Sequence, residues 1–268
     1  MLLTELLDGD DKVGMNGANF DNIRIDGITC DSRMVKTGYL FAAIPGIQKD
    51  GRDFIPEALN RGAAAILAPP GTALEPPNLQ VPLLINENPR RQYALMAARF
   101  FSEQPKTVAC VTGTNGKTSV VSFLRQIWVA AGYPAASAGT LGIEIAGHPE
   151  SNVPAFRNVI NLTTPDSIDL HRNLLELTDY GVNHLGLEAS SHGLAQHRLD
   201  GVRVTSAAFT NLTRDHLDYH GAAEDYLAAK LRLFSNILLE GGTVVINADM
   251  SEASMLHDIA AERGLKVI

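Results

Sequence analysis

Residues 113–119 contain the side chains and glycines of this chain that are best suited to holding a phosphate group. The two glycines of this segment let the backbone turn tightly and bring its N–H groups close to phosphate oxygens. Lys117 can reach the β- and γ-phosphates of a nucleotide triphosphate, and the Thr118 hydroxyl can bind Mg²⁺. We therefore predict a phosphate-binding loop that comprises Gly113, Thr114, Asn115, Gly116, Lys117, Thr118 and Ser119.

The pattern around this loop predicts a strand before it and a helix after it. An apolar run at 107–110 precedes the loop, and apolar residues at helical spacing follow it at 120–131. The start of that helix adds about half a positive charge. Two residues separate the glycines, whereas the common motif has four. A glycine-rich turn with an exposed lysine is the alternative, and the loop alone also fits a P-loop NTPase or kinase of another class.

Polar side chains also follow a predicted strand at 184–189. Glu188 can hold Mg²⁺ directly or through water, and Ser190 and His192 follow it closely. A surface loop with a capping serine is the alternative for this segment. A little further on, Arg198 beside Gln196 can bind a carboxylate or phosphate through two hydrogen bonds, unless it is simply a solvated arginine.

A polar run at 209–221 follows another apolar strand, and it includes two aspartates and two histidines within residues 215–220. These side chains suggest metal or phosphate contact, although a histidine-rich turn without a metal fits the same spacing. Neither an HExxH motif nor paired cysteines are present, which argues against zinc. Lys230 lies in a helical run, and this pattern alone predicts an ordinary exposed lysine.

Composition and charge narrow the class of protein. The chain has 268 residues, which suits one large domain or two ordinary ones. Its formal net charge is −8, whereas a protein that binds nucleic acid generally needs a positively charged surface. We therefore expect no nucleic-acid partner. Cys30 and Cys110 show no CxxC spacing and predict buried thiols in a reducing compartment. The acidic start and the lack of an apolar run near ~20 residues predict a cytoplasmic location without a membrane partner.

The elements that must position these residues form two predicted α/β units. In the first, residues 1–103, the pattern predicts strands at 40–44, 64–68 and 81–85 and helices at 54–61 and 90–102. In the second, residues 104–268, it predicts strands at 107–112, 135–138, 184–189, 204–210 and 243–247, and helices at 117–131, 166–180, 223–235 and 251–263. This alternation is typical of a mostly parallel sheet with helices on both faces, in which ligands lie at the carboxyl ends of the strands. Residues 264–268 are typical of the start of a further strand, so we expect the second domain to be incomplete.

Together, these motifs resemble those of the Mur ligase family. The residues that carry the resemblance occur in the expected order at 31–33, 38–41, 50–55, 113–119, 163–165, 188–194, 196–198, 210–221 and 229–230. Within the family, the run at 190–194 and the long run at 214–221 resemble those of the ligases that add the third amino acid to the peptidoglycan stem.

The resemblance implies an ATP-dependent ligase that adds a diamino acid to UDP-MurNAc-L-Ala-D-Glu through an acyl phosphate. It places Ser32, with Cys30 beside it, at the UDP end of that substrate in the N-terminal domain. It places Thr163, Thr164, Ser190, Gln196 and Arg198 at the muramoyl-dipeptide. It implies Mg²⁺ held by Thr118, Glu188, His216 and Lys230 as a carbamylated lysine, and catalytic roles for Lys117, Lys230 and His216. The family's C-terminal domain, which binds the incoming diamino acid, is expected to be absent here, so a substrate-binding fragment without turnover is the alternative.

Overall fold

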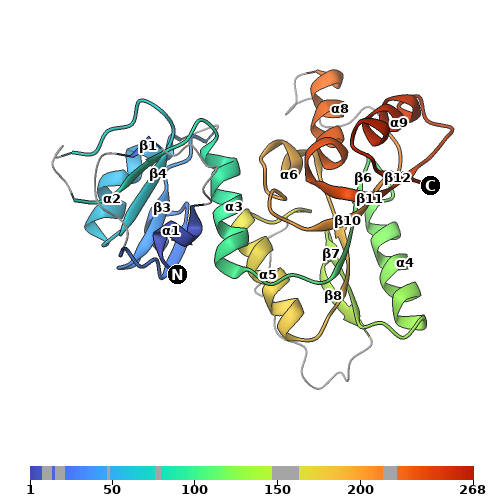
Figure 1. Cartoon of the computed structure of the whole chain (residues 1–268), viewed down its shortest axis with the longest axis horizontal. Helices are drawn as coiled ribbons and strands as arrows, with labels where there is room; N and C mark the ends of the chain where they lie inside the picture. Colours follow the sequence, from blue (N-terminus) through green and yellow to red (C-terminus); the bar gives the residue numbers. More distant parts are fainter. Residues whose placement is uncertain (8–13, 16–21, 47–48, 76–79, 147–162, 214–221) are drawn as a thin grey trace. The chain divides into compact units, whose positions relative to one another are not determined.

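The computed structural model describes residues 1–7, 14–15, 22–46, 49–75, 80–146, 163–213 and 222–268. The chain divides into two compact units, Met1–Phe100 and Phe101–Ile268, whose elements are labelled in Figure 1.

The first unit is built on a five-stranded sheet. Its strand order is β1 (Gly14–Met15), β5 (Leu83–Ile85), β4 (Ala65–Ala68), β3 (Tyr39–Ala42) and β2 (Gly27–Thr29), and only β1 runs antiparallel to its neighbour. The helical elements are α1 (Leu3–Leu6), η1 (Ser32–Met34), η2 (Gly51–Phe54), α2 (Ile55–Asn60) and α3 (Pro89–Phe101). Phe41 and Ile66 of the sheet pack with Ile55 and Ala58 of α2 in a buried core. The Asp31 carboxylate begins η1 by accepting a hydrogen bond from the Arg33 amide.

The second unit is built on a seven-stranded sheet. Its order is β12 (Lys266–Val267), β11 (Leu238–Ile246), β10 (Val204–Phe209), β6 (Thr107–Thr112), β9 (His184–Glu188), β7 (Ala135–Gly139) and β8 (Gly142–Ala146). All neighbouring strands are parallel except the β7–β8 hairpin. Strand β6 therefore lies in the middle, between β10 and β9, and its carboxyl end opens into the predicted phosphate loop.

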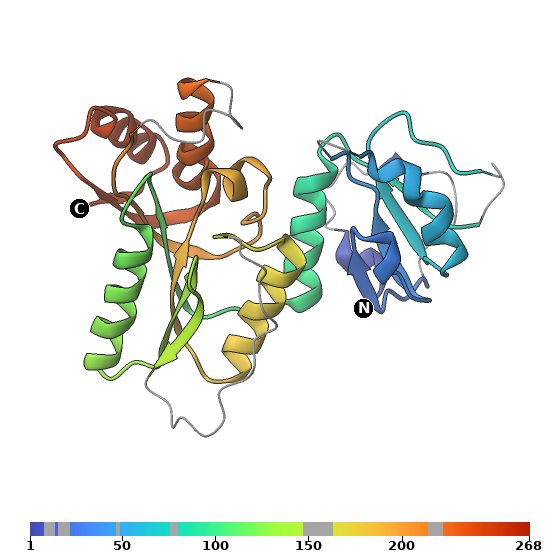
Figure 2. The same cartoon turned by 180° about the vertical axis from the view of Figure 1, so that it is seen from behind.

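Helices cover both faces of this sheet (Figures 1 and 2). Helix α4 (Lys117–Ala130) lies on one face, where a Cβ added to Gly186 of β9 would meet Val121 at 3.1 Å. The other face carries α5 (Ser167–Asp179), α6 (Ser191–Ala195), α8 (Ala223–Arg232), the π-helical turn η4 (Leu233–Ile237) and α9 (Ala253–Glu262). Leu185 and Leu187, which alternate with Gly186, point to that second face and pack in one core with Leu174 of α5.

The predicted fold class, an α/β fold with a mostly parallel sheet, is confirmed. The predicted strand at 107–112 has the bounds of β6, but β11 begins at Leu238 instead of 243 and the antiparallel strand β8 was not predicted. The prediction that both thiols are buried is wrong for Cys30, which is exposed because it lies in the turn after β2; Cys110 is buried within β6. None of the helices formed by the described residues is long and apolar enough to cross a bilayer.

Candidate active site

The loop between β6 and α4 adopts a backbone that requires its two glycines. Gly113 has φ +141° and Gly116 has φ +87°, a region that residues with side chains rarely adopt. At Gly113 there is also no space, because an added Cβ would lie 2.0 Å from the hydroxyl oxygen of Thr210. The sequence therefore specifies a tight turn that brings the loop backbone against the carboxyl end of β10.

Lys117 is the first residue of α4 and folds back over this loop. Its Nζ donates hydrogen bonds of 2.9 Å to the carbonyl oxygens of both Gly113 and Thr114. The N–H groups of the first turn of a helix have no intrahelical partners, and here they belong to Lys117, Thr118 and Ser119. An ammonium group, these N–H groups and the positive end of the helix dipole all favour an anion at this point.

The segment that follows β10 holds the loop in this conformation. Thr210 donates its hydroxyl to the carbonyl oxygen of Asn115 at 2.6 Å, and the side-chain amide of Asn211 donates to the same oxygen at 3.1 Å. In return, the Asn115 amide donates to Oδ1 of Asn211 at 3.0 Å, and the Thr114 amide donates to the Asn211 carbonyl at 2.9 Å. These protein contacts hold the loop backbone in one conformation, which reduces the entropy that binding would cost.

Lys230 contacts the same loop from helix α8. Its side chain is buried, with 1% of the residue exposed, and Nζ donates to the Gly113 carbonyl at 2.9 Å. Nζ also lies 4.4 Å from the centre of the Tyr226 ring, four residues earlier on the same face of the helix. The prediction of an exposed lysine, made from the helical pattern alone, is therefore wrong, because this face of α8 packs against the loop.

Glu188 lies at the carboxyl end of β9 and is also 1% exposed. Its Oε1 accepts from the Thr140 amide at 3.0 Å, and its Oε2 accepts from the Thr140 hydroxyl at 3.2 Å. An added Cβ on Gly139 would lie 2.1 Å from Oε1, so only glycine allows this approach. Thr118 and Glu188 line the same small hollow.

The surroundings of Glu188 fit a divalent cation. Glu188 takes part in none of the ion pairs found within the described ranges, so its buried charge has no cationic side chain to balance it there. Hydroxyl and carboxylate oxygens such as those of Thr118 and Glu188 are ligands that Mg²⁺ prefers. In the part of the chain that the structure describes, no group of three or more His, Cys, Asp or Glu side chains is arranged to hold a metal. The predicted ligand His216 lies outside the described residues.

Thr164 is the centre of a hydrogen-bond network that joins several of the predicted substrate-binding residues. Its hydroxyl donates to the Glu188 carbonyl at 3.1 Å and accepts from both the amide and the hydroxyl of Ser190, each at 3.0 Å. Ser190 in turn begins α6 by accepting from the Gly193 amide. The hydroxyl oxygen of Thr163 lies 3.1 Å from the hydroxyl oxygen of Thr140, which also donates to Glu188.

The Gln196–Arg198 pair joins this network at the same edge of the sheet. Arg198 donates through Nη1 to the Thr164 carbonyl at 2.7 Å, and through Nε and Nη2 to Oε1 of Gln196 at 3.2 and 2.7 Å. Arg198 is therefore not the solvated arginine that the sequence alone allowed. Thr163, Thr164, Ser190, Gln196 and Arg198 form one polar cluster around the end of β9.

The remaining predicted contacts lie in the first unit. Ser32 is buried, and its hydroxyl donates to Oε2 of Glu57 at 2.6 Å. That hydrogen bond lowers the pKa of the Glu57 carboxyl below its usual value. Cys30 is exposed two residues before Ser32.

Three residues with structural roles at the site were given no role from the sequence. Thr140 orients Glu188, Asn211 holds the phosphate loop, and Tyr226 covers Lys230. Asn211 comes directly after the strand predicted at 204–210, and Thr140 comes two residues after the strand predicted at 135–138, which is a signal that could have been used. Tyr226 precedes Lys230 by four residues, a helical spacing that places both on one face.

Models of one protein family match both units of the chain. Residues 111–268 match the Mur ligase middle domain, and residues 24–101 match the Mur ligase family, catalytic domain. The chain belongs to the Mur ligase family, which confirms the resemblance found in the sequence.

Individual relatives within this family share one name. The chain is similar to proteins named UDP-N-acetylmuramoyl-L-alanyl-D-glutamate--2,6-diaminopimelate ligase from Caulobacter vibrioides (53% identical over 85% of this chain and 46% of the relative) and Bradyrhizobium diazoefficiens (49%, over 92% and 48%). A solved structure with the same name superposes with a TM-score of 0.79 at 29% identity, covering 100% of this chain and 52% of that one. The chain spans about half the length of the curated relatives it matches.

Proposed function

We propose that this chain supplies the ATP site and the muramoyl-dipeptide site of a ligase that joins 2,6-diaminopimelate to UDP-MurNAc-L-Ala-D-Glu in peptidoglycan precursor synthesis. The observation that carries the proposal is the arrangement around β6 and β9, where a phosphate loop lies beside the polar cluster centred on Thr164. A phosphate loop alone would suit many nucleotide hydrolases. The Thr164 cluster adds a set of hydroxyl, amide and guanidinium groups that suits a carboxylate-bearing acceptor.

ATP supplies the activating group in this proposal. A carboxylate oxygen of the D-Glu residue attacks the γ-phosphorus, ADP leaves, and an acyl phosphate forms. The amine of diaminopimelate then attacks the acyl carbon, inorganic phosphate leaves, and the amine loses a proton to give the amide. This scheme needs no side-chain nucleophile, so the protein contributes mainly by positioning and electrostatic stabilisation.

The residues of the chain have distinct roles in the proposal. Lys117 and the first N–H groups of α4 hold the phosphates. Gly113 and Gly116 let the loop backbone come close to the phosphate oxygens. Arg198 and Gln196, together with the threonine and serine hydroxyls of the cluster, orient the D-Glu carboxylate. In the first unit, Ser32 and Cys30 contact the UDP end of the same substrate.

Thr118, Glu188, His216 and Lys230 are the residues proposed to hold Mg²⁺. Lys230 is proposed to be carbamylated, a change in which its neutral amine adds CO₂ and loses a proton to become an anionic oxygen ligand. The contact of Lys230 with the Gly113 carbonyl supports a role for this residue at the loop. Its burial supports the modification, because a charged ammonium group is costly to bury.

The test is ADP release by this chain with Mg-ATP, with each other substrate omitted in turn. The proposal predicts that sustained release over many turnovers requires both UDP-MurNAc-L-Ala-D-Glu and diaminopimelate, because ADP leaves when the acyl phosphate forms and diaminopimelate then removes the acyl group. Rapid ADP release without the muramoyl substrate would instead indicate a nucleotide hydrolase of another class. Tight binding of the muramoyl substrate without any release would indicate the substrate-binding fragment considered from the sequence.

A further inference from the structure

His197 lies between Gln196 and Arg198 and has an unusual backbone. Its φ of +58° lies in the left-handed region, where a residue with a side chain costs about 1–2 kcal/mol more than in the right-handed one. Such a conformation persists only where surrounding contacts hold it. On either side of it, the side chains of Gln196 and Arg198 lie together, joined by two hydrogen bonds from Arg198 to Oε1 of Gln196.

The contacts that hold His197 come from Arg232 and Asp200. Nη2 of Arg232 lies 2.8 Å from Nδ1 of His197 and 3.2 Å from both carboxylate oxygens of Asp200. Arg232 also donates through Nη1 to the carbonyl oxygen of Leu194 in α6. The Asp200 carbonyl is in turn 3.1 Å from Nε2 of the buried His171 in α5.

These distances determine the proton arrangement of His197. A guanidinium group can only donate, so Nδ1 of His197 accepts from Arg232 and the ring proton is on Nε2. The 3.3 Å contact from Nδ1 to Oδ1 of Asp200 is then between two acceptors, and Arg232 bridges them. Without Arg232, the same contact would favour a proton on Nδ1, donated to Asp200.

We propose that Arg232 is a positioning residue that, through His197 and Asp200, sets the Gln196–Arg198 pair for the D-Glu end of the substrate. Arg232 is the last residue of α8 and follows Lys230 by two positions, so the same helix that reaches the phosphate loop also fixes this pair. Among the described residues, the Arg232 side chain contacts Leu194, His197 and Asp200, none of which is proposed to bind substrate, so Arg232 acts through its neighbours. The inference rests on the proposed function for the identity of the substrate. The position of the His197 ring proton tests, independently of any substrate, whether Arg232 holds His197.

The experiment measures affinities of the chain for UDP-MurNAc-L-Ala-D-Glu and UDP-MurNAc-L-Ala, together with ¹⁵N shifts of the His197 ring. In the unchanged chain we expect tighter binding of the dipeptide nucleotide and a proton on Nε2. Arg232→Met should reduce that preference about tenfold, since small misplacements of positioning groups have large effects, and should move the ring proton to Nδ1. Arg232→Lys keeps a donor and should retain most of the preference.

Arg263→Met is the matched control, because Arg263 is also half-buried and donates to a backbone carbonyl, that of Phe234. It should change neither the preference nor the His197 ring. His197→Gly, which relieves the left-handed strain but removes the imidazole, should lower the preference as Arg232→Met does.

A preference retained in Arg232→Met, or a ring proton that stays on Nε2, would overturn the inference. If the unchanged chain shows no preference between the two nucleotides, the proposed substrate fails. In that case the ring proton of Arg232→Met still decides whether Arg232 holds His197.

Discussion

The buried Nζ of Lys230 lies 2.9 Å from the carbonyl oxygen of Gly113, although the two residues are 117 positions apart in the sequence. Lys117 donates to the same oxygen at the same distance. Two lysines from two helices therefore meet at the first residue of the phosphate loop. This convergence places α8 at the nucleotide site and gives Lys230 a role that its exposed-looking helical pattern does not predict.

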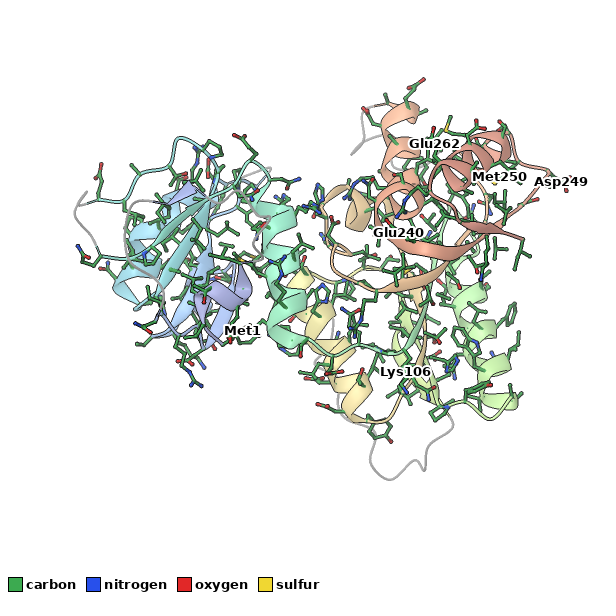
Figure 3. The ribbon with its side chains drawn as sticks, in the orientation of Figure 1. Met1, Lys106, Glu240, Asp249, Met250 and Glu262 are labelled. Atoms are coloured by element: carbon green, nitrogen blue, oxygen red, sulfur yellow. The ribbon has the colours of Figure 1, made fainter. Side chains whose placement is uncertain are left out.

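Replacing Lys117 with methionine should weaken Mg-ATP binding by about tenfold to a hundredfold, the range expected for losing a hydrogen bond to a charged group. Isothermal titration calorimetry on the chain measures this directly. Lys106→Met is the control, because Lys106 is exposed and precedes β6, at the end of the strand away from the loop (Figure 3). Equal affinities in the two variants would argue against the phosphate-binding role of Lys117.

Gly139→Ala should displace the Glu188 side chain, since the added Cβ would lie 2.1 Å from Oε1. We expect a loss of about 1–3 kcal/mol in the free energy of unfolding, as for other overpacked sites. Trp128, the single tryptophan, lies on α4 and reports unfolding of the second unit by fluorescence.

The functional part of this prediction concerns Mg²⁺. The unchanged chain should be stabilised by Mg²⁺ with ATP, and Gly139→Ala should lose that stabilisation. Gly142→Ala is the control in the same hairpin, because its φ is +85° but the added Cβ meets nothing within 4 Å. If Gly139→Ala and Gly142→Ala respond equally to Mg²⁺, Glu188 is not a ligand of the ion.

Stability should fall as the pH drops from about 6.5 towards 4, because of the buried His171. Burial lowers its pKa to about 4 from the usual 6.5, so the unfolded chain binds more protons than the folded chain between these values. The full effect is about 3 kcal/mol, from a difference of about 2.5 pKa units.

Urea unfolding followed by Trp128 fluorescence at pH 7 and pH 4.5 measures this effect. His171→Leu should lose less stability over this interval than the unchanged chain does. His257→Leu, at an exposed position of α9, should leave the pH dependence as it is. An identical pH dependence in His171→Leu would show that another group is responsible.

Cys30 should react with a maleimide in the folded chain, whereas Cys110 should not. Cys30 is exposed, while Cys110 is buried and its burial raises the pKa of its thiol far above the usual value. If the UDP end of the substrate contacts Cys30, UDP-MurNAc-L-Ala-D-Glu at about ten times its Kd should slow the reaction roughly tenfold. ATP should give no protection, and Cys30→Ser should abolish labelling. Unchanged labelling with bound substrate would remove Cys30 from the proposed contact.

Much of the second unit could be predicted because its strands are short apolar runs separated by turn residues. The carboxyl ends of β6, β9 and β10 were placed to within a residue, and parallel pairing then brings their polar residues to one edge. Of the β7–β8 hairpin, only the first strand was predicted, because β8 is short and none of its five residues is fully buried.

The contacts within the site depend on tertiary packing that no local pattern contains. Thr140 reaches Glu188 across 48 positions, and Arg232 reaches Asp200 across 32. Lys230 looks exposed from its helix because burial there comes from the phosphate loop and not from apolar neighbours in the sequence. The left-handed backbone of His197 likewise has no sequence signal, since neither glycine nor asparagine is present at that position.

The mass of the UDP-muramoyl product tests the central claim most directly. The intact gene product that contains this chain would be incubated with Mg-ATP, UDP-MurNAc-L-Ala-D-Glu and either diaminopimelate or lysine, and the nucleotide fraction analysed by mass spectrometry. We predict conversion to the tripeptide nucleotide carrying diaminopimelate, in an amount equal to the ADP released, with lysine giving much less. An unchanged UDP-MurNAc-L-Ala-D-Glu mass with both amino acids would contradict the assignment of this ligase activity to the chain.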